Sequence, residues 1–263
     1  MESVTLGRPR APSARGRIAV LALLLLAAAA AWALTADRMD GMDPSPAADL
    51  GGLGWFAASW TLMMAAMMLP SFAPAATAYA GRSTTPSVIA FVAGYLAAWT
   101  GAGVVAYGLI EAVRSLELGF LAWGEAGGYV AGVVIVAAAL YELSSLKDAC
   151  LRRCRDPLAL VRRERPGAGE GLRAGLEHGA ACIGCCWALM AALFALGVMS
   201  LGWMVLVAAL VAVEKLLPRR EVAERGVALV LVLLGLAVAF FPGELPGFTS
   251  PGSDEIMMME PMR

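Results

Sequence analysis

Charged residues are scarce in this sequence: Asp, Glu, Lys and Arg make up 16% of its 263 residues, whereas hydrophobic residues make up 60%. This composition excludes an ordinary soluble domain and indicates an integral membrane protein. Histidine occurs only once, which argues against a catalytic site built from several histidines. The sequence also shows no pattern typical of a Ser-His-Asp triad, a phosphate-binding loop or a zinc protease. We therefore expect a binding or transport protein rather than an enzyme.

Long apolar runs occupy most of the chain. A membrane-spanning helix needs about 20 mainly apolar residues, and the sequence accommodates six or seven such helices, of which we expect seven. Their expected ranges are 18–34, 55–79, 86–113, 127–146, 174–197, 199–217 and 226–241. If the N-terminus is cytosolic, 17 of the 20 Lys and Arg residues lie on the cytosolic side, as the positive-inside rule requires. The predicted fold is an all-α bundle of about seven transmembrane helices in the bilayer of a bacterial inner membrane, with the N-terminus inside and the C-terminus outside.

The polar segments divide the chain further. Residues 1–17 form a basic cytosolic arm, and because no aromatic residue accompanies its arginines, nucleic-acid binding is not expected. Residues 18–241 form a single transmembrane domain. Its cytosolic loop, 147–173, begins with a stretch free of helix breakers, so the fourth span is expected to continue through Cys150 and Cys154. Residues 242–263 form a flexible external tail that is rich in Pro, Gly and Met.

The segment HGAACIGCCWALM holds the single histidine and three of the five cysteines. The metal ligands predicted in it are His178, Cys182, Cys185 and Cys186. On an α-helix these residues project from one face, at about 0, 40, −20 and 80 degrees. That face is about 12 Å long, too long for all four to reach one ion at ligand distances of about 2.0–2.3 Å. Either two or three of them share an ion with ligands from other helices, or Gly179 and Gly184 let the helix break around the metal.

The second predicted span carries four further sulfur ligands, Met63, Met64, Met67 and Met68. They form two adjacent rows on a helix, just before Pro70 and Pro74. Thiolate and thioether groups are the ligands that select Cu(I). A proline inside the span weakens the helix and can open a cavity there. Apolar packing is the alternative role for these methionines.

Sulfur ligands are distributed unequally across the predicted membrane. Cys150 and Cys154 lie at the inner end of the fourth span, whereas Met39, Met42 and the methionines of the tail lie outside. Methionine cannot be lost to disulfide formation in an oxidising exterior. Cysteines inside and methionines outside suit a Cu(I) pathway in which Cys150 and Cys154 capture the metal at the cytosolic face. The alternative is that Cys150 and Cys154 are inert thiols.

Three ionisable residues, Glu142, Glu214 and Lys215, lie near the inner ends of predicted spans. Snorkelling to the interface or a local ion pair suffices to explain them. Glu214 is a candidate for a proton or cation relay if the sixth span packs on the fifth.

Three motifs together resemble a known family: WTLMMAAMMLPS from Trp60, YELSSLKDACLRRCRDPL from Tyr141, and HGAACIGCCWALMAALFALGVMSLGWM followed by EKLLP. The combination resembles DUF2182, a bacterial family described as predicted metal-binding integral membrane proteins. The resemblance covers roughly residues 55–218. The sequence departs from the family pattern at Ala181, where an aromatic residue is expected, and at Ser145, where proline is expected. The resemblance implies metal binding but names neither the metal nor an activity.

The predicted function is binding of a soft transition metal, most simply Cu(I), for transport or delivery across or into the inner membrane. A metallochaperone or an exported metalloprotein would be the partner. Without an ATP-binding motif, any transport is passive, ion-coupled or partner-dependent. One alternative is a membrane thiol-disulfide oxidoreductase that uses the Cys182 and Cys185 pair. Another is a structural assembly factor whose cysteines and histidine hold zinc.

Overall fold

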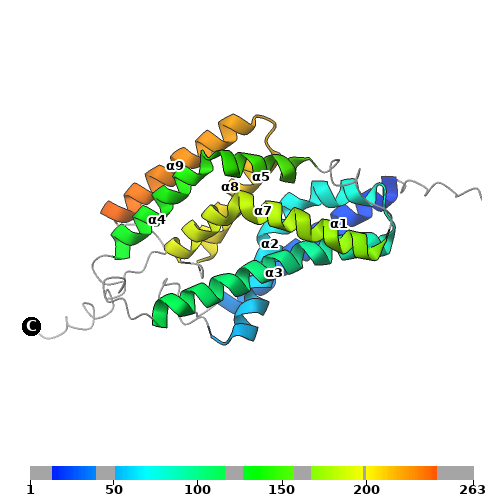
Figure 1. The fold of residues 1–263 in the computed structure, drawn as a ribbon, viewed down its shortest axis with the longest axis horizontal. Coiled ribbons are helices and arrows are strands. Elements are labelled where there is room, and N and C mark those ends of the chain that lie inside the picture. The colour runs from blue at the N-terminus through cyan, green and yellow to red at the C-terminus, as the bar shows by residue number, and fades with distance from the viewer. Residues whose placement is uncertain (1–13, 40–50, 116–126, 157–166, 198–199, 242–263) are drawn as a thin grey trace, which may run out of the picture.

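The computed structural model describes residues 14–39, 51–115, 127–156, 167–197 and 200–241. This part of the chain forms eight helices and no strand. The helices are α1 (Ala14–Met39), α2 (Leu53–Ala80), α3 (Thr85–Ser115), α4 (Gly127–Glu142), α5 (Ser145–Arg155), α7 (Ala168–Leu196), α8 (Leu201–Leu216) and α9 (Arg220–Phe240) (Figure 1). The predicted tail, most of the basic arm, Met42 and residues 157–166 of the cytosolic loop lie outside the described residues.

Five helices are long and apolar enough to cross a membrane: α1, α2, α3, α7 and α9. Large apolar side chains are exposed along α1 and α9. Examples are Ile18, Leu23 and Leu26 on α1, and Leu229, Leu233 and Phe240 on α9. A soluble protein rarely exposes such continuous apolar faces, whereas lipid covers them without cost. The all-α class is therefore confirmed, and a membrane location is supported.

The fourth predicted span differs from expectation. The helix does not continue from the span through Cys150 and Cys154: α4 ends at Glu142, and α5 leaves it at an angle of 65°. The physical reason is a new helix start, because the Ser144 side chain accepts a hydrogen bond from the Lys147 amide at 3.2 Å and caps α5. The pair α4 and α5 qualifies as one bent span, which raises the number of candidate spans to six. Helix α8, with 16 residues, is about 24 Å long, so the seven-span count stays a prediction.

Helices α3 and α7 pack closely along their lengths (Figure 1). Gly171, Gly175 and Gly179 on α7 face α3, spaced by four residues. A Cβ atom at Gly175 would collide with the Phe91 carbonyl oxygen and lie 2.9 Å from the Tyr95 amide nitrogen. Small residues at this spacing let two membrane helices approach backbone to backbone. The close approach brings the Tyr95 side chain of α3 to the cysteine-bearing face of α7.

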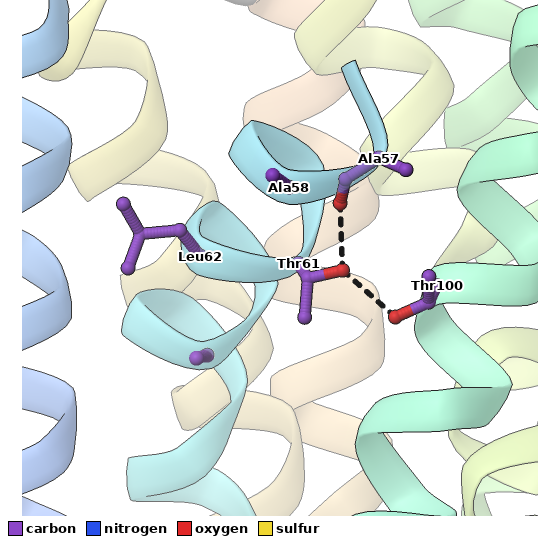
Figure 2. Close-up of a pocket in the computed structure, with 6 residues that line it drawn as sticks. Ala57, Ala58, Thr61, Leu62 and Thr100 are labelled. Carbon is purple, nitrogen blue, oxygen red and sulfur yellow. Dashed lines mark hydrogen bonds between the residues drawn. The ribbon is translucent and has the colours of Figure 1, made fainter. Parts of the chain in front are cut away.

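Helix α2 runs without interruption through Pro70 and Pro74, so the prolines do not break the span. An open groove of about 480 Å³ lies instead near the N-terminal end of α2, lined by Ala57, Ala58, Thr61, Leu62, Ala65 and Thr100. There the hydroxyl groups of Thr61 and Thr100 lie 2.7 Å apart and link α2 to α3 (Figure 2). Its lining residues include none of the predicted metal ligands.

Candidate metal centre

Helix α5 lies against α7 and presents its cysteines to it. Helix α7 is continuous from Ala168 to Leu196, so Gly179 and Gly184 do not break it around a metal. Gly184 instead makes room for α5, because a Cβ atom there would lie 2.6 Å from the Cys150 Sγ atom. The Tyr141 hydroxyl donates a hydrogen bond to the Gly184 carbonyl oxygen at 2.6 Å and fastens α4 to the same point. The continuous helix excludes one of the two arrangements left open by the sequence, a helix broken around the metal. The other, in which residues of different helices come together, agrees with the contact between α5 and α7.

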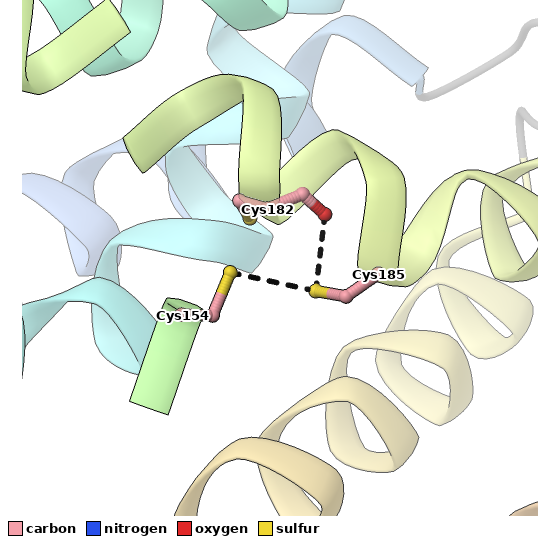
Figure 3. Close-up of side chains that lie close together, drawn as sticks. All are labelled: Cys154, Cys182 and Cys185. Atoms are coloured by element: carbon pink, nitrogen blue, oxygen red, sulfur yellow. Dashed lines mark hydrogen bonds between the residues drawn. The ribbon is translucent and has the colours of Figure 1, made fainter. Parts of the chain in front are cut away.

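Three thiol groups converge where α5 meets α7. The Sγ atoms of Cys154, Cys182 and Cys185 all lie within 4.8 Å of one another, and those of Cys154 and Cys185 are 3.7 Å apart. Figure 3 shows Cys154 pointing from the end of α5 toward Cys185. Three sulfurs bound to one ion at about 2.3 Å would lie about 4 Å apart. The three thiols therefore need only small shifts to surround one ion.

Cys182 occupies the most polar surroundings of the three. It is fully buried, and its Sγ atom accepts a hydrogen bond from the Lys215 ammonium at 2.8 Å. The Tyr95 hydroxyl lies 3.1 Å from the same sulfur. A buried thiolate is costly unless positive charge and hydrogen-bond donors surround it. The site thus provides for the charged sulfur that metal binding requires.

Cys185 and Cys186 both donate thiol hydrogen bonds to the Cys182 carbonyl oxygen, at 3.1 Å and 2.8 Å. The Sγ atom of Cys186 lies 4.0 Å from that of Cys182, yet Cys186 does not belong to the group of three. A thiol must lose its proton to bind a metal. Metal binding at Cys185 therefore exchanges a weak hydrogen bond for a metal–sulfur bond.

His178 lies apart from the three thiols, in an aromatic cage. It is buried on α7, and its ring centroid lies 5.4 to 6.0 Å from those of Phe72, Phe91 and Tyr95. Its Nδ1 atom has no hydrogen-bond partner among the described residues. His178 and Cys150 are both outside the group of three.

All four methionines of α2 are buried, with exposed fractions of 4% or less, in the same apolar core as the cysteines of α7. Rings connect the two helices: Trp60 stacks on Phe194 at 5.6 Å, and Phe72 contacts His178. These positions suit both roles considered for Met63, Met64, Met67 and Met68, packing and metal binding. Their part as ligands stays a prediction.

Sequence reasoning missed the role of Lys215 and Tyr95. Lys215 contacts the Cys182 sulfur instead of snorkelling to the interface. Glu214 forms its ion pair with Lys147 of α5 and not with its neighbour in the chain, and Glu142 pairs with the same lysine. The signal for such partners was the position of Glu142 inside an apolar span, where a carboxylate requires a counter-ion.

A family comparison agrees with this chemistry. The sequence model of a family described as "PpoB2: Copper chaperone" matches residues 57–238. The matched region begins in α2 and ends in α9, and so contains all five cysteines and the single histidine. Comparison with curated proteins and with solved structures gives no match. Thiols are ligands that copper(I) favours, and the resemblance noted from the motifs also implied metal binding. The chain belongs to the PpoB2 copper chaperone family.

Proposed function

We propose that the protein binds Cu(I) through Cys154, Cys182 and Cys185 and passes it across or into the membrane. The observation that carries this proposal is the convergence of three thiols from two helices within 4.8 Å. Three soft sulfur ligands in a buried site favour Cu(I) over the harder divalent ions. A structural zinc site takes four ligands in a tetrahedron, and the group found among the described residues has three.

We propose that the helices form a bundle of seven spans with the N-terminus in the cytosol of a bacterium. The distribution of Lys and Arg supports this orientation. In it, α5 lies at the cytosolic side, so the three-thiol site is reached from the cytosol. Copper delivered by a cytosolic metallochaperone would enter there, and an exported metalloprotein would receive it on the other side.

The remaining predicted ligands take supporting parts in this proposal. Cys150, beside Gly184, captures copper and hands it to Cys154 one helical turn away. Cys186 and His178 extend the site along α7. The buried methionine rows of α2 offer thioether ligands beyond the thiols.

A thiol-disulfide relay between Cys182 and Cys185 is less favoured. The two residues are three apart on a continuous helix, where the Cβ atoms of such pairs are about 5–6 Å apart. A disulfide needs Cβ atoms about 3.5–4.5 Å apart. Forming one would distort α7 beside Gly184, where α5 packs against it.

X-ray absorption spectroscopy of the copper-loaded protein tests the proposed ligand set. The expected spectrum is that of Cu(I) bound by three sulfur atoms, and Cys154→Ser should reduce the number of sulfur ligands. A spectrum dominated by nitrogen or oxygen ligands would contradict the proposal. Arg152→Ser, on the same helix as Cys154 but exposed, is the control that should leave the spectrum unchanged.

A further inference from the structure

Three buried ionisable residues meet close to the metal centre but outside it. Glu142 of α4, Lys147 of α5 and Glu214 of α8 have exposed fractions of 2% or less. The Lys147 ammonium forms ion pairs with both carboxylates. We call these residues the Glu-Lys-Glu cluster. Because its members come from three helices, the cluster ties α5 to the rest of the bundle.

The charges in the cluster do not cancel. Two carboxylates share a single ammonium, and the Oε1 atom of Glu142 has no partner in the described part of the chain. The neighbouring cations are engaged elsewhere. The Arg155 guanidinium donates to the backbone carbonyl oxygens of Glu214 and Leu217, and the Lys215 ammonium donates to Cys182.

The other acidic group of α5 is also accounted for. Asp148 forms ion pairs with Arg152 of its own helix and with Arg220 of α9, the latter at 2.8 Å. It therefore supplies no free charge to the cluster. An unpaired carboxylate in a buried apolar setting is strongly unfavourable. A proton on one of the two cluster carboxyl groups removes the excess charge.

The geometry points to a proton-binding site: the Glu-Lys-Glu cluster holds one proton, which leaves when Cu(I) binds at Cys154, Cys182 and Cys185. This inference rests on the proposed copper function. The balance counts every proton: one Cu⁺ enters the thiol site, each protonated thiol that becomes a ligand releases its H⁺ to water, and one further H⁺ leaves a cluster carboxyl group for water. No electron is transferred.

Two contacts couple the proton to the metal. Lys147 lies on the same short helix as Cys154. A shift of α5 when copper binds Cys154 therefore also moves Lys147. Lys215 contacts the Cys182 sulfur and follows Glu214 directly in the chain. Copper takes the lone pair of the Cys182 sulfur that otherwise accepts from Lys215, so the ammonium turns from the sulfur toward the carboxylate side. Added positive charge on that side favours ionised carboxylates, and the proton leaves.

This exchange would give the protein an energy source that its sequence otherwise lacks. The carboxyl proton leaves in addition to the thiol protons that Cu⁺ replaces, so copper entry is linked to proton release. A proton gradient could then drive copper in one direction.

Proton release during copper binding is the direct test. Wild-type protein in detergent, in weak buffer and without oxygen, is titrated with Cu(I) from a weak chelator while a pH dye records the protons released per bound copper. Glu142→Gln and Glu214→Gln should each release about one proton fewer than the wild type. Glu177→Gln, an exposed carboxylate on α7, should match the wild type. Equal release from all four proteins would overturn the inference.

The same titration separates this inference from the proposed function, because failure of the wild type to bind copper would refute the latter. Infrared difference spectroscopy on the wild type tests the inference without any variant, so the result does not depend on whether the variants fold. Copper should remove a carbonyl band of a protonated carboxyl group, and that band should shift in heavy water. A wild-type protein that binds copper without loss of this band would overturn the inference.

Discussion

The Sγ atoms of Cys154 and Cys185 lie 3.7 Å apart, although 31 residues separate the two cysteines in the chain. One comes from a short helix that leaves α4 at 65°, and the other from the middle of a continuous helix. A metal site made from two separate helices can be opened by moving one of them. The position of α5 therefore decides whether three sulfurs or two are available to copper.

Cys154→Ser should lower the affinity for Cu(I) by more than about 100-fold. Substitutions in the surroundings of a metal site already cost about 10- to 100-fold, and this change removes one of three ligands. Competition with a Cu(I) chelator measures the affinity. Cys150→Ser, one turn earlier on α5, should leave the equilibrium affinity close to that of the wild type, because its sulfur is outside the group of three. An equal loss in both variants would contradict the assignment.

Gly184→Ala should weaken copper binding by pushing α5 away from α7. The added Cβ atom would lie 2.6 Å from the Cys150 Sγ atom and 3.3 Å from its Cβ atom. Crowding of this kind costs about 1–3 kcal/mol, equivalent to about a 5- to 150-fold loss if it falls on the metal-binding arrangement. Gly226→Ala on α9, where nothing lies within 4 Å, is the control. Chelator competition with unchanged affinity in Gly184→Ala would refute the expected role of this glycine.

Gly175→Ala should destabilise the fold itself. Its Cβ atom would press on the backbone of Phe91 and Tyr95, which cannot move aside as a flexible side chain can. The expected cost is about 1–3 kcal/mol in the free energy of unfolding, measured by denaturant unfolding in detergent. Gly101→Ala on α3 faces open space and should be neutral or slightly stabilising. A Gly175→Ala protein as stable as the wild type would show that α3 and α7 are not held this closely.

Lys147→Met should be far more damaging than Arg152→Met on the same helix. The first change removes the only ammonium of the Glu-Lys-Glu cluster and leaves a buried carboxylate without its counter-ion, at a cost of about 3–5 kcal/mol. The second removes an exposed ion pair with Asp148, worth about 1 kcal/mol or less. Thermal unfolding of both variants provides the comparison, and similar melting temperatures would argue against a buried ion pair.

Met64→Leu combined with Met67→Leu should lower Cu(I) affinity by about tenfold or more, the size expected when the surroundings of a metal site change. Zinc affinity should stay unchanged, because zinc takes nitrogen, oxygen and thiolate ligands. Met204→Leu, at an equally buried methionine of α8, is the control for packing. If copper affinity is unaffected in the double variant, Met64 and Met67 are packing residues of the apolar core and not copper ligands.

The helices were predictable because the membrane fixes the length of an apolar run. The second span, expected at 55–79, is α2 at Leu53–Ala80. The break before α5 was not foreseen, although Ser144 and Ser145 form the kind of start signal that caps a helix. The absence of Gly and Pro before Pro157 favours a continuous helix, but a capping serine starts a new helix without either residue.

The candidate site was predictable only along one helix. Helical periodicity places His178, Cys182 and Cys185 on one face, but it does not show what lies opposite each of them. The structure places aromatic rings around His178 and a second helix beside Cys185. The Lys215 contact with Cys182 spans 33 residues. It depends on the packing of α8 against α7, which the periodicity of one helix does not show.

Metal content tests the central claim most directly. Protein purified in detergent, under reducing and oxygen-free conditions, is analysed by mass spectrometry for bound metal. The wild type should carry about one copper ion per chain, the capacity of one three-thiol site. A variant with serine at positions 154, 182 and 185 should carry none while keeping its helical content. Copper-free wild type, or copper retained without the three thiols, would contradict the claim.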